Sequence, residues 1–171
     1  ALPHETISRS AALSLGLRGH VCRYVPLLVM AAVGIWGWSA AVPGTNWFYL
    51  GSILWWVAPV IMLQWFVAAE YICSMGTARV AVAMVAPSAY LSLVDHYAIQ
   101  SGVWRINPQC STGLDWLLPG LPLEEGLFFF VTNVMIVCGV LAFDRCYYIG
   151  RCILERVQPP LDVATASRGP P

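Results

Sequence analysis

The chain has 171 residues, of which 58% are hydrophobic and only 11% are charged, and its formal net charge is zero. A soluble domain carries roughly 25% charged residues, so this composition excludes an ordinary soluble enzyme. A neutral net charge gives no support to nucleic acid as a partner. The mean hydropathy of +0.68 predicts instead an all-α integral membrane protein.

Four apolar segments are long enough to cross a bilayer, since about 20 helical residues match the roughly 30 Å hydrocarbon core. In chain order they are residues 24–42, 47–69, 80–99 and 126–143. The first ends at Pro43-Gly44, and the second contains Pro59, which is expected to kink it. The third carries Asp95 and His96 in its last turn, so the apolar pattern does not define its end. We therefore predict about four transmembrane helices.

The arginines indicate how these spans are oriented. All nine basic residues are arginine, and with four spans only Arg105 falls on one side of the membrane. The other side receives Arg9, Arg18, Arg23, Arg79, Arg145, Arg151, Arg156 and Arg168. The positive-inside rule then predicts that both termini are cytoplasmic. The connection 101–121 is placed on the opposite side, together with Asp95 and the two glutamates that follow it.

The segments outside the spans have a different composition. Residues 1–23 lack the apolar region of a signal peptide and are predicted to be a cytoplasmic N-terminal segment. Residues 146–171 are predicted to be a linker or tail, which becomes polar and Pro-rich from Val157 onward.

Six cysteines are present, with no CxxC pair and no histidine at zinc spacing. We expect them to pack as small apolar residues, without a disulfide framework, and we expect no metal site. They are Cys22, Cys73, Cys110, Cys138, Cys146 and Cys152. The chain also lacks the GxGxxG, HExxH and GxSxG motifs, so no flavin, nicotinamide or other cofactor is expected.

The segment Pro122-Leu123-Glu124-Glu125 leads directly into the fourth span. Ionisable groups at the edge of hydrocarbon are costly, and desolvation favours the uncharged carboxyl form, so one of these glutamates is a candidate proton donor to an apolar substrate. An equally simple interpretation is structural, because proline starts helices well and acids are stabilised in a first helical turn. Adjacent helical residues point about 100° apart, so at most one glutamate is the donor.

Asp95 lies where a third helix is predicted to end. A carboxylate is disfavoured at a helix C-terminus, so we expect it to have a partner, either Arg105 or His96. A catalytic role and an ordinary helix-end charge are both open for Asp95. His96 by itself is more typical of an interfacial histidine than of a ligand.

Polar and aromatic residues follow the glutamates inside the fourth span. Thr132 and Asn133 are expected to join helices by hydrogen bonds. Phe128, Phe129 and Phe130 cover a wide arc of the helix. They either face lipid and neighbouring helices or form an aromatic wall that stabilises a cation beside the acid.

Two strings of residues resemble the lycopene cyclase domain family. They are Pro87…Tyr90-Leu91…Asp95-His96-Tyr97-Ala98-Ile99…Gly102-Val103-Trp104-Arg105-Ile106 and Leu121-Pro122-Leu123-Glu124-Glu125…Phe128-Phe129. The family comprises heterodimeric bacterial and archaeal carotenoid cyclases and the cyclase half of the fungal bifunctional lycopene cyclase/phytoene synthase. The resemblance covers about residues 24–150, and the flanks look most like the fungal type.

The resemblance implies an architecture of two homologous three-span halves, each with one Pro-x-Glu-Glu element. Residues 46–145 would then form one complete half-domain, and residues 24–42 would be the last helix of the preceding half. No Pro-x-Glu-Glu element precedes Tyr24, so the chain looks like the second half of a cyclase. Because three spans is an odd number, successive halves would be inverted in the membrane.

The resemblance also implies a reaction, the redox-neutral closure of acyclic carotene ends into β-rings by an acid. Glu124 or Glu125 would supply the proton, and Asp95 would be a second proton-handling group. Pro122, Trp104, Phe128 and Phe129 would contact the substrate. No cofactor and no metal are implied.

The implied partners are lycopene or a related acyclic carotene, membrane lipid and a complementary cyclase half, with a fused phytoene synthase domain in the fungal case. The fungal resemblance implies the endoplasmic reticulum. The alternative is a carotenoid-binding or assembly module that has no activity, and a small transporter ranks last because charges at mid-depth are absent.

Overall fold

The computed structural model describes residues 17–157 and contains four long helices in that range. They are α2 (Leu17–Ala40), α3 (Phe48–Ser74), α4 (Thr77–Gln100) and α5 (Leu123–Val157). All four are long and apolar enough to cross a membrane. The predicted all-α membrane class and the four spans are therefore confirmed.

The helices are longer than the apolar runs that predicted them. Helix α5 continues from the predicted end at Phe143 to Val157, so residues 146–157 are helical rather than the start of a tail. At 1.5 Å per residue, its 35 residues are about 52 Å long, more than the hydrocarbon core requires. The remaining part of the predicted tail, 158–171, and residues 1–16 lie outside the described range.

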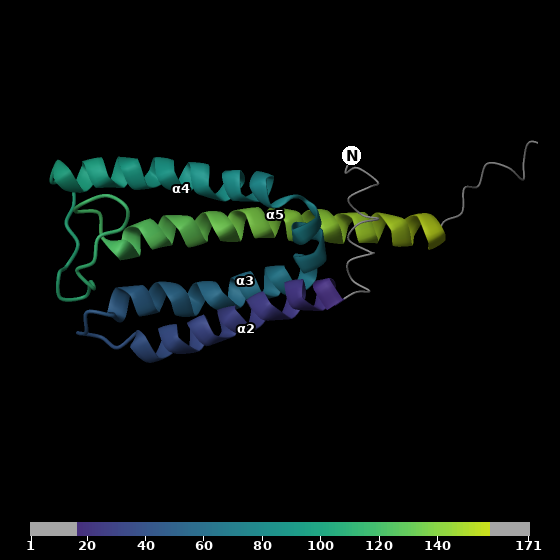
Figure 1. The fold of residues 1–171 in the computed structure, drawn as a ribbon, viewed down its shortest axis with the longest axis horizontal. Coiled ribbons are helices and arrows are strands. Elements are labelled where there is room, and N and C mark those ends of the chain that lie inside the picture. Colours follow the sequence, from purple (N-terminus) through teal and green to yellow (C-terminus); the bar gives the residue numbers. More distant parts are fainter. Residues whose placement is uncertain (1–16, 158–171) are drawn as a thin grey trace, which may run out of the picture.

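Helix α5 is the centre of the arrangement. Helices α2 and α3 form an antiparallel hairpin, and α5 packs against α3 on one side and α4 on the other. Figure 1 shows α5 between α4 and α3, with α2 beside α3. The connections 41–47 and 101–122 lie at one end of the bundle, and the far end of α5 extends beyond the other helices.

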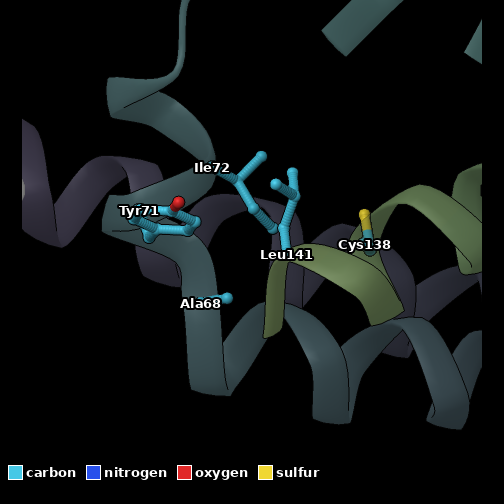
Figure 2. Close-up of a cluster of buried hydrophobic side chains, with 5 residues drawn as sticks. All are labelled: Ala68, Tyr71, Ile72, Cys138 and Leu141. Atoms are coloured by element: carbon cyan, nitrogen blue, oxygen red, sulfur yellow. The ribbon is translucent and has the colours of Figure 1, made fainter. Parts of the chain in front are cut away.

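Two apolar clusters hold α3 to α5. The first lies toward the far end and contains Ala68, Tyr71, Ile72, Cys138 and Leu141. Figure 2 shows the side chains of Ile72 and Leu141 meeting between the two helices. The second cluster lies nearer the connection 101–122 and contains Ile53, Val57, Ile61 and Val131. The two clusters fix which face of α5 meets α3.

A disulfide joins α2 to α3 at the far end, between Cys22 and Cys73. The prediction that the cysteines form no disulfide is therefore wrong for this pair. Its members are 51 residues apart and meet only because α2 folds back on α3, which cysteine spacing cannot reveal. Cys110, Cys138, Cys146 and Cys152 are free.

A buried ion-pair network lies at the same end. Glu70 on α3 is 3% exposed and pairs with Arg23 of α2 and, at 2.9 Å, with Arg145 of α5. Glu70 falls just past the predicted end of the second span, and the sequence analysis missed it. The network ties three helices together through one carboxylate.

The connection 101–122 starts with a Schellman turn at the end of α4. The N–H of Gly102 donates to the carbonyl of Ile99, and the N–H of Val103 donates to the carbonyl of Ala98, each at 3.0 Å. Gly102 has a φ of +71°, a conformation that glycine adopts without steric cost. The turn sends the chain back over the last turn of α4.

The rest of this connection folds onto the start of α5. Asp115 and Pro122 form an antiparallel β-bridge. Beside it, the Trp116 N–H donates a 2.7 Å hydrogen bond to the Leu121 carbonyl. The N–H of Tyr49 in α3 donates to the carbonyl of Cys110 at 3.2 Å. The connection therefore covers the first turns of both α3 and α5.

Candidate active site

Glu124 lies in the first turn of α5 and is completely buried. Its Oε1 accepts a 2.6 Å hydrogen bond from the Thr112 backbone N–H, and its Oε2 accepts one of 3.2 Å from the Ser111 hydroxyl. Both donors belong to the connection 101–122. Glu124 thus holds this connection against the helix, and both its oxygens are occupied.

Glu125 points elsewhere. Its Oε1 accepts a 2.7 Å hydrogen bond from the hydroxyl of Tyr49, which lies in the first turn of α3. Glu125 is half-buried and makes no other side-chain hydrogen bond among those of the described residues. The two glutamates therefore diverge as helix geometry predicted, one toward the loop and the other toward α3.

Asp95 is 4% exposed near the end of α4, and its partner is the side chain of Trp104. Its Oδ2 has no hydrogen-bond partner within residues 17–157. The prediction of Arg105 or His96 as partner is wrong: the ion pairs of the described residues do not include Asp95, and the buried Nδ1 of His96 is itself unpaired. The Schellman turn explains the difference, because it returns Trp104 to the last turn of α4.

These groups form a carboxyl cluster, which we define as Asp95, Glu124, Glu125 and the Tyr49 hydroxyl. Asp95 and Glu124 both lie close enough to act electrostatically on Glu125 and on Tyr49. The ion pairs found in residues 17–157 all lie elsewhere, so none of the cluster's carboxyl groups pairs with a cation there. Three carboxyl groups gathered in an apolar setting without a paired cation are costly to ionise together.

The cluster is not arranged as a metal site. Within the described range, no group of three histidine, cysteine or acidic side chains could hold a metal ion. The carboxyl groups instead point toward a loop, a tyrosine and an indole. What this arrangement can do chemically is store and transfer a proton at the end of an apolar helix bundle.

Trp116 fixes the connection 101–122 over the first turn of α5. Gly126 is buried directly beneath its indole ring, and a Cβ atom at this position would collide with that ring. Only glycine allows the loop to approach the helix so closely beside Glu125. Sequence analysis found the Gly126 position only as the first residue of an apolar run.

The predicted contact residues are distributed around the cluster. Trp104 is 48% exposed and bound to Asp95, and Pro122 lies immediately before α5. Phe128 packs against the second apolar cluster, and its ring centroid is 5.9 Å from that of Phe129. Neither phenylalanine lines either of the two cavities beside α5, whereas Phe130 lines both.

The polar residues inside α5 have separate roles. The Asn133 amide donates to Ser88 of α4 at 3.2 Å and to the Phe129 carbonyl at 2.9 Å, so its predicted role in joining helices is confirmed. The Thr132 hydroxyl is buried without a hydrogen-bond partner, so the same prediction is wrong for Thr132.

Sequence reasoning missed Tyr49, Ser111, Thr112 and Trp116. Tyr49 looks like one more aromatic residue at a membrane interface, and nothing in the sequence marks it as a partner of Glu125. Ser111-Thr112 is a polar pair within a loop rich in glycine, proline and tryptophan, which is a weak signal on its own.

The helices and the carboxyl cluster identify the chain as a multi-pass helical membrane protein with a carboxyl cluster at one end of an apolar bundle. No protein-family model matches the chain, and no solved structure is a significant match. Named relatives do match. The bifunctional lycopene cyclase/phytoene synthase of Phycomyces blakesleeanus is 38% identical over 130 residues, which are 75% of this chain and 21% of that protein.

Two further relatives extend the comparison. The protein of the same name from Sporisorium reilianum is 39% identical over 73% of this chain and 19% of its own length. The lycopene beta-cyclase of Halobacterium salinarum is 44% identical over 56% of this chain and 39% of its own length. The chain belongs to the lycopene cyclase domain family. It spans about a fifth of the length of the fungal relatives and about two fifths of the archaeal one.

Proposed function

We propose that this chain is a lycopene β-cyclase module that closes the acyclic ends of lycopene into β-rings, together with a complementary cyclase half. The observation that carries the proposal is the carboxyl cluster at the edge of the apolar bundle, in a chain whose relatives are named lycopene cyclases. Such a cluster supplies what an apolar alkene needs, a proton held out of bulk water.

The reaction is an isomerisation, so nothing is oxidised or reduced. A carboxyl O–H bond breaks and its proton adds to the terminal double bond, which leaves a tertiary cation. The neighbouring alkene attacks that cation and closes a six-membered ring. A proton is then lost from a ring carbon, which restores a double bond.

We assign the donor role to Glu125. Both oxygens of Glu124 are engaged by the connection 101–122, whereas Glu125 has one hydrogen bond, to a hydroxyl that can both donate and accept. Asp95, with its unpaired Oδ2, is the candidate acceptor for the proton that leaves the ring. Trp104 orients Asp95, and the phenylalanines of α5 add cation-stabilising aromatic faces.

The membrane arrangement is part of the same proposal. Both termini are cytoplasmic and the carboxyl cluster is on the opposite face, in the endoplasmic reticulum, with the other half inverted beside it. The arginine distribution supports this orientation. The Cys22–Cys73 disulfide opposes it, because it lies at the arginine-rich end and disulfides are rare in the cytosol.

Pigment analysis tests the function. Lycopene-accumulating cells would express the chain alone, then with a complementary N-terminal half, with Glu124→Gln and Glu125→Gln as variants. We expect cyclised carotenes only with the partner, none with Glu125→Gln, and measurable product with Glu124→Gln. Unchanged lycopene in every well-expressed combination would favour a carotenoid-binding module without activity.

A further inference from the structure

A long apolar cavity of about 420 Å³ lies between α2, α3 and α5. Its wall consists of apolar side chains and includes Met30 and Val33 from α2, Val57 and Trp65 from α3, and Val134 and Cys138 from α5. A cavity with this lining excludes water, because water needs polar partners. The space is therefore suited to a hydrocarbon.

The length and the volume of the cavity together show that it is narrow. On α5 they run from Leu127 to Cys138, and on α3 from Leu54 to Trp65. Each stretch has twelve residues, and the eleven steps between its ends correspond to about 16 Å at 1.5 Å per residue. A volume of about 420 Å³ spread over that length is the shape of a slot for an extended chain rather than for a compact ligand.

One end of this slot lies near the first turns of α3 and α5, which carry Tyr49 and Glu125. Leu127 is two residues beyond Glu125 and projects from a different side of α5, so the slot approaches Glu125 by way of Tyr49. The ring of Tyr49 packs against the apolar cluster whose members Val57 and Val131 also line the slot. The other end, at Trp65 and Cys138, reaches the first apolar cluster, toward the far end of the bundle.

From this arrangement we propose that the slot binds the extended polyene of the acyclic carotene and presents its end group to Glu125. This inference rests on the proposed function and adds the location of the substrate. Helix α2 supplies part of the slot's wall, so the polyene lies between α2, α3 and α5.

A lipid acyl chain has the same apolar chemistry, so the test must separate the two occupants. The full chain is placed in phosphatidylcholine nanodiscs and titrated with lycopene. Lycopene is achiral, and its visible absorption acquires circular dichroism only when a chiral site holds it. We expect a saturable signal at one lycopene per chain. A signal that never saturates, or none, would assign the slot to lipid and overturn the proposal.

Two substitutions fill the slot from different helices, Val33→Phe on α2 and Val134→Phe on α5. Each adds volume inside the slot, so we expect the apparent Kd for lycopene to rise about tenfold or more. The matched controls are Ile35→Phe and Ile136→Phe on the same helices, at positions that are 72% and 56% exposed. They should change Kd by less than about twofold.

The outcomes separate this site from the proposed activity. If Ile35→Phe and Ile136→Phe weaken lycopene binding as much as the slot variants do, the proposed site is overturned. Cyclised product from wild type, combined with unchanged lycopene binding by Val33→Phe and Val134→Phe, would overturn the site and leave the cyclase function standing. Saturable binding that both slot variants weaken supports the site, even if no cyclised product forms with any partner.

Discussion

At the scale of single residues, the two adjacent glutamates make different contacts, because a helix turns about 100° per residue and their side chains point in different directions. Glu124 completes the hydrogen bonding of a loop, and Glu125 meets one tyrosine hydroxyl. A shared sequence motif therefore contains one anchor and one candidate acid. We therefore expect substitution of Glu124 to lower stability and substitution of Glu125 to lower turnover.

Tyr49→Phe tests the partner of the acid. The change removes the hydroxyl that donates to Glu125 and leaves the ring packed against the apolar cluster. We expect cyclisation to fall about 100-fold, the lower end of the usual contribution of a group that assists proton transfer, while lycopene binding is retained. Pigment ratios and binding in nanodiscs measure the two effects. Tyr97→Phe, at a position 74% exposed, is the control, and an equal loss there would contradict this role.

Glu124→Ala tests the anchor. The change leaves the Thr112 N–H and the Ser111 hydroxyl without their acceptor in a buried place. An unpaired buried polar group costs about 1–3 kcal/mol, so we expect a lower unfolding temperature in detergent. Glu125→Gln, which keeps the shape and can still accept from Tyr49, should unfold close to wild type. A stable Glu124→Ala protein would show that the loop does not depend on this carboxylate.

At the scale of elements, the connection 101–122 and the first turn of α5 act as one unit. The Schellman turn at Gly102 and the bridge at Asp115 and Pro122 set its path, and Trp116 seats it over Gly126. The carboxyl cluster is assembled by this unit from α3, α4 and α5. Its geometry therefore depends on the loop as much as on the helices.

Gly126→Ala should displace the loop, because the added methyl group collides with the indole of Trp116. We expect faster proteolysis within 101–122 and a cyclisation rate reduced about tenfold, as small misplacements of a catalytic group are costly. Limited proteolysis and pigment ratios measure these effects. Gly150→Ala on the same helix meets no atom within 4 Å and should be neutral or slightly stabilising. Slow proteolysis of Gly126→Ala would contradict the seating of the loop.

At the scale of the whole molecule, the two ends of the bundle differ in chemistry. One end carries the carboxyl cluster, which has no paired cation in the described part of the chain, and the other carries the Glu70 network and the disulfide. Glu70→Ala would leave Arg23 and Arg145 without their shared carboxylate. We expect a loss of about 2 kcal/mol in unfolding free energy, below the value for a fully buried pair because both arginines are partly exposed.

The native cysteines report the orientation of these ends. Cys110 lies in the connection 101–122, and the exposed Cys146 lies near the opposite end of the bundle on α5. In sealed endoplasmic-reticulum vesicles with the cytoplasmic face outward, an impermeant maleimide should label Cys146 at once and Cys110 only after permeabilisation. Cys110→Ser and Cys146→Ser assign the two signals. The reverse order would place the arginine-rich end, with its disulfide, in the lumen.

Patterns in the sequence were sufficient to predict the all-α membrane class, the four spans, the divergence of the two glutamates and the resemblance to lycopene cyclases. These follow from local rules, because hydrocarbon forces apolar runs into helices and a helix fixes the angle between neighbours. Tertiary structure alone decided the Tyr49–Glu125 contact, the Trp104 partner of Asp95, the Cys22–Cys73 disulfide, the Glu70 network and the apolar slot. Each of these depends on which helix faces meet or how a loop folds back, and a uniformly apolar helix carries almost no periodic signal of its buried side.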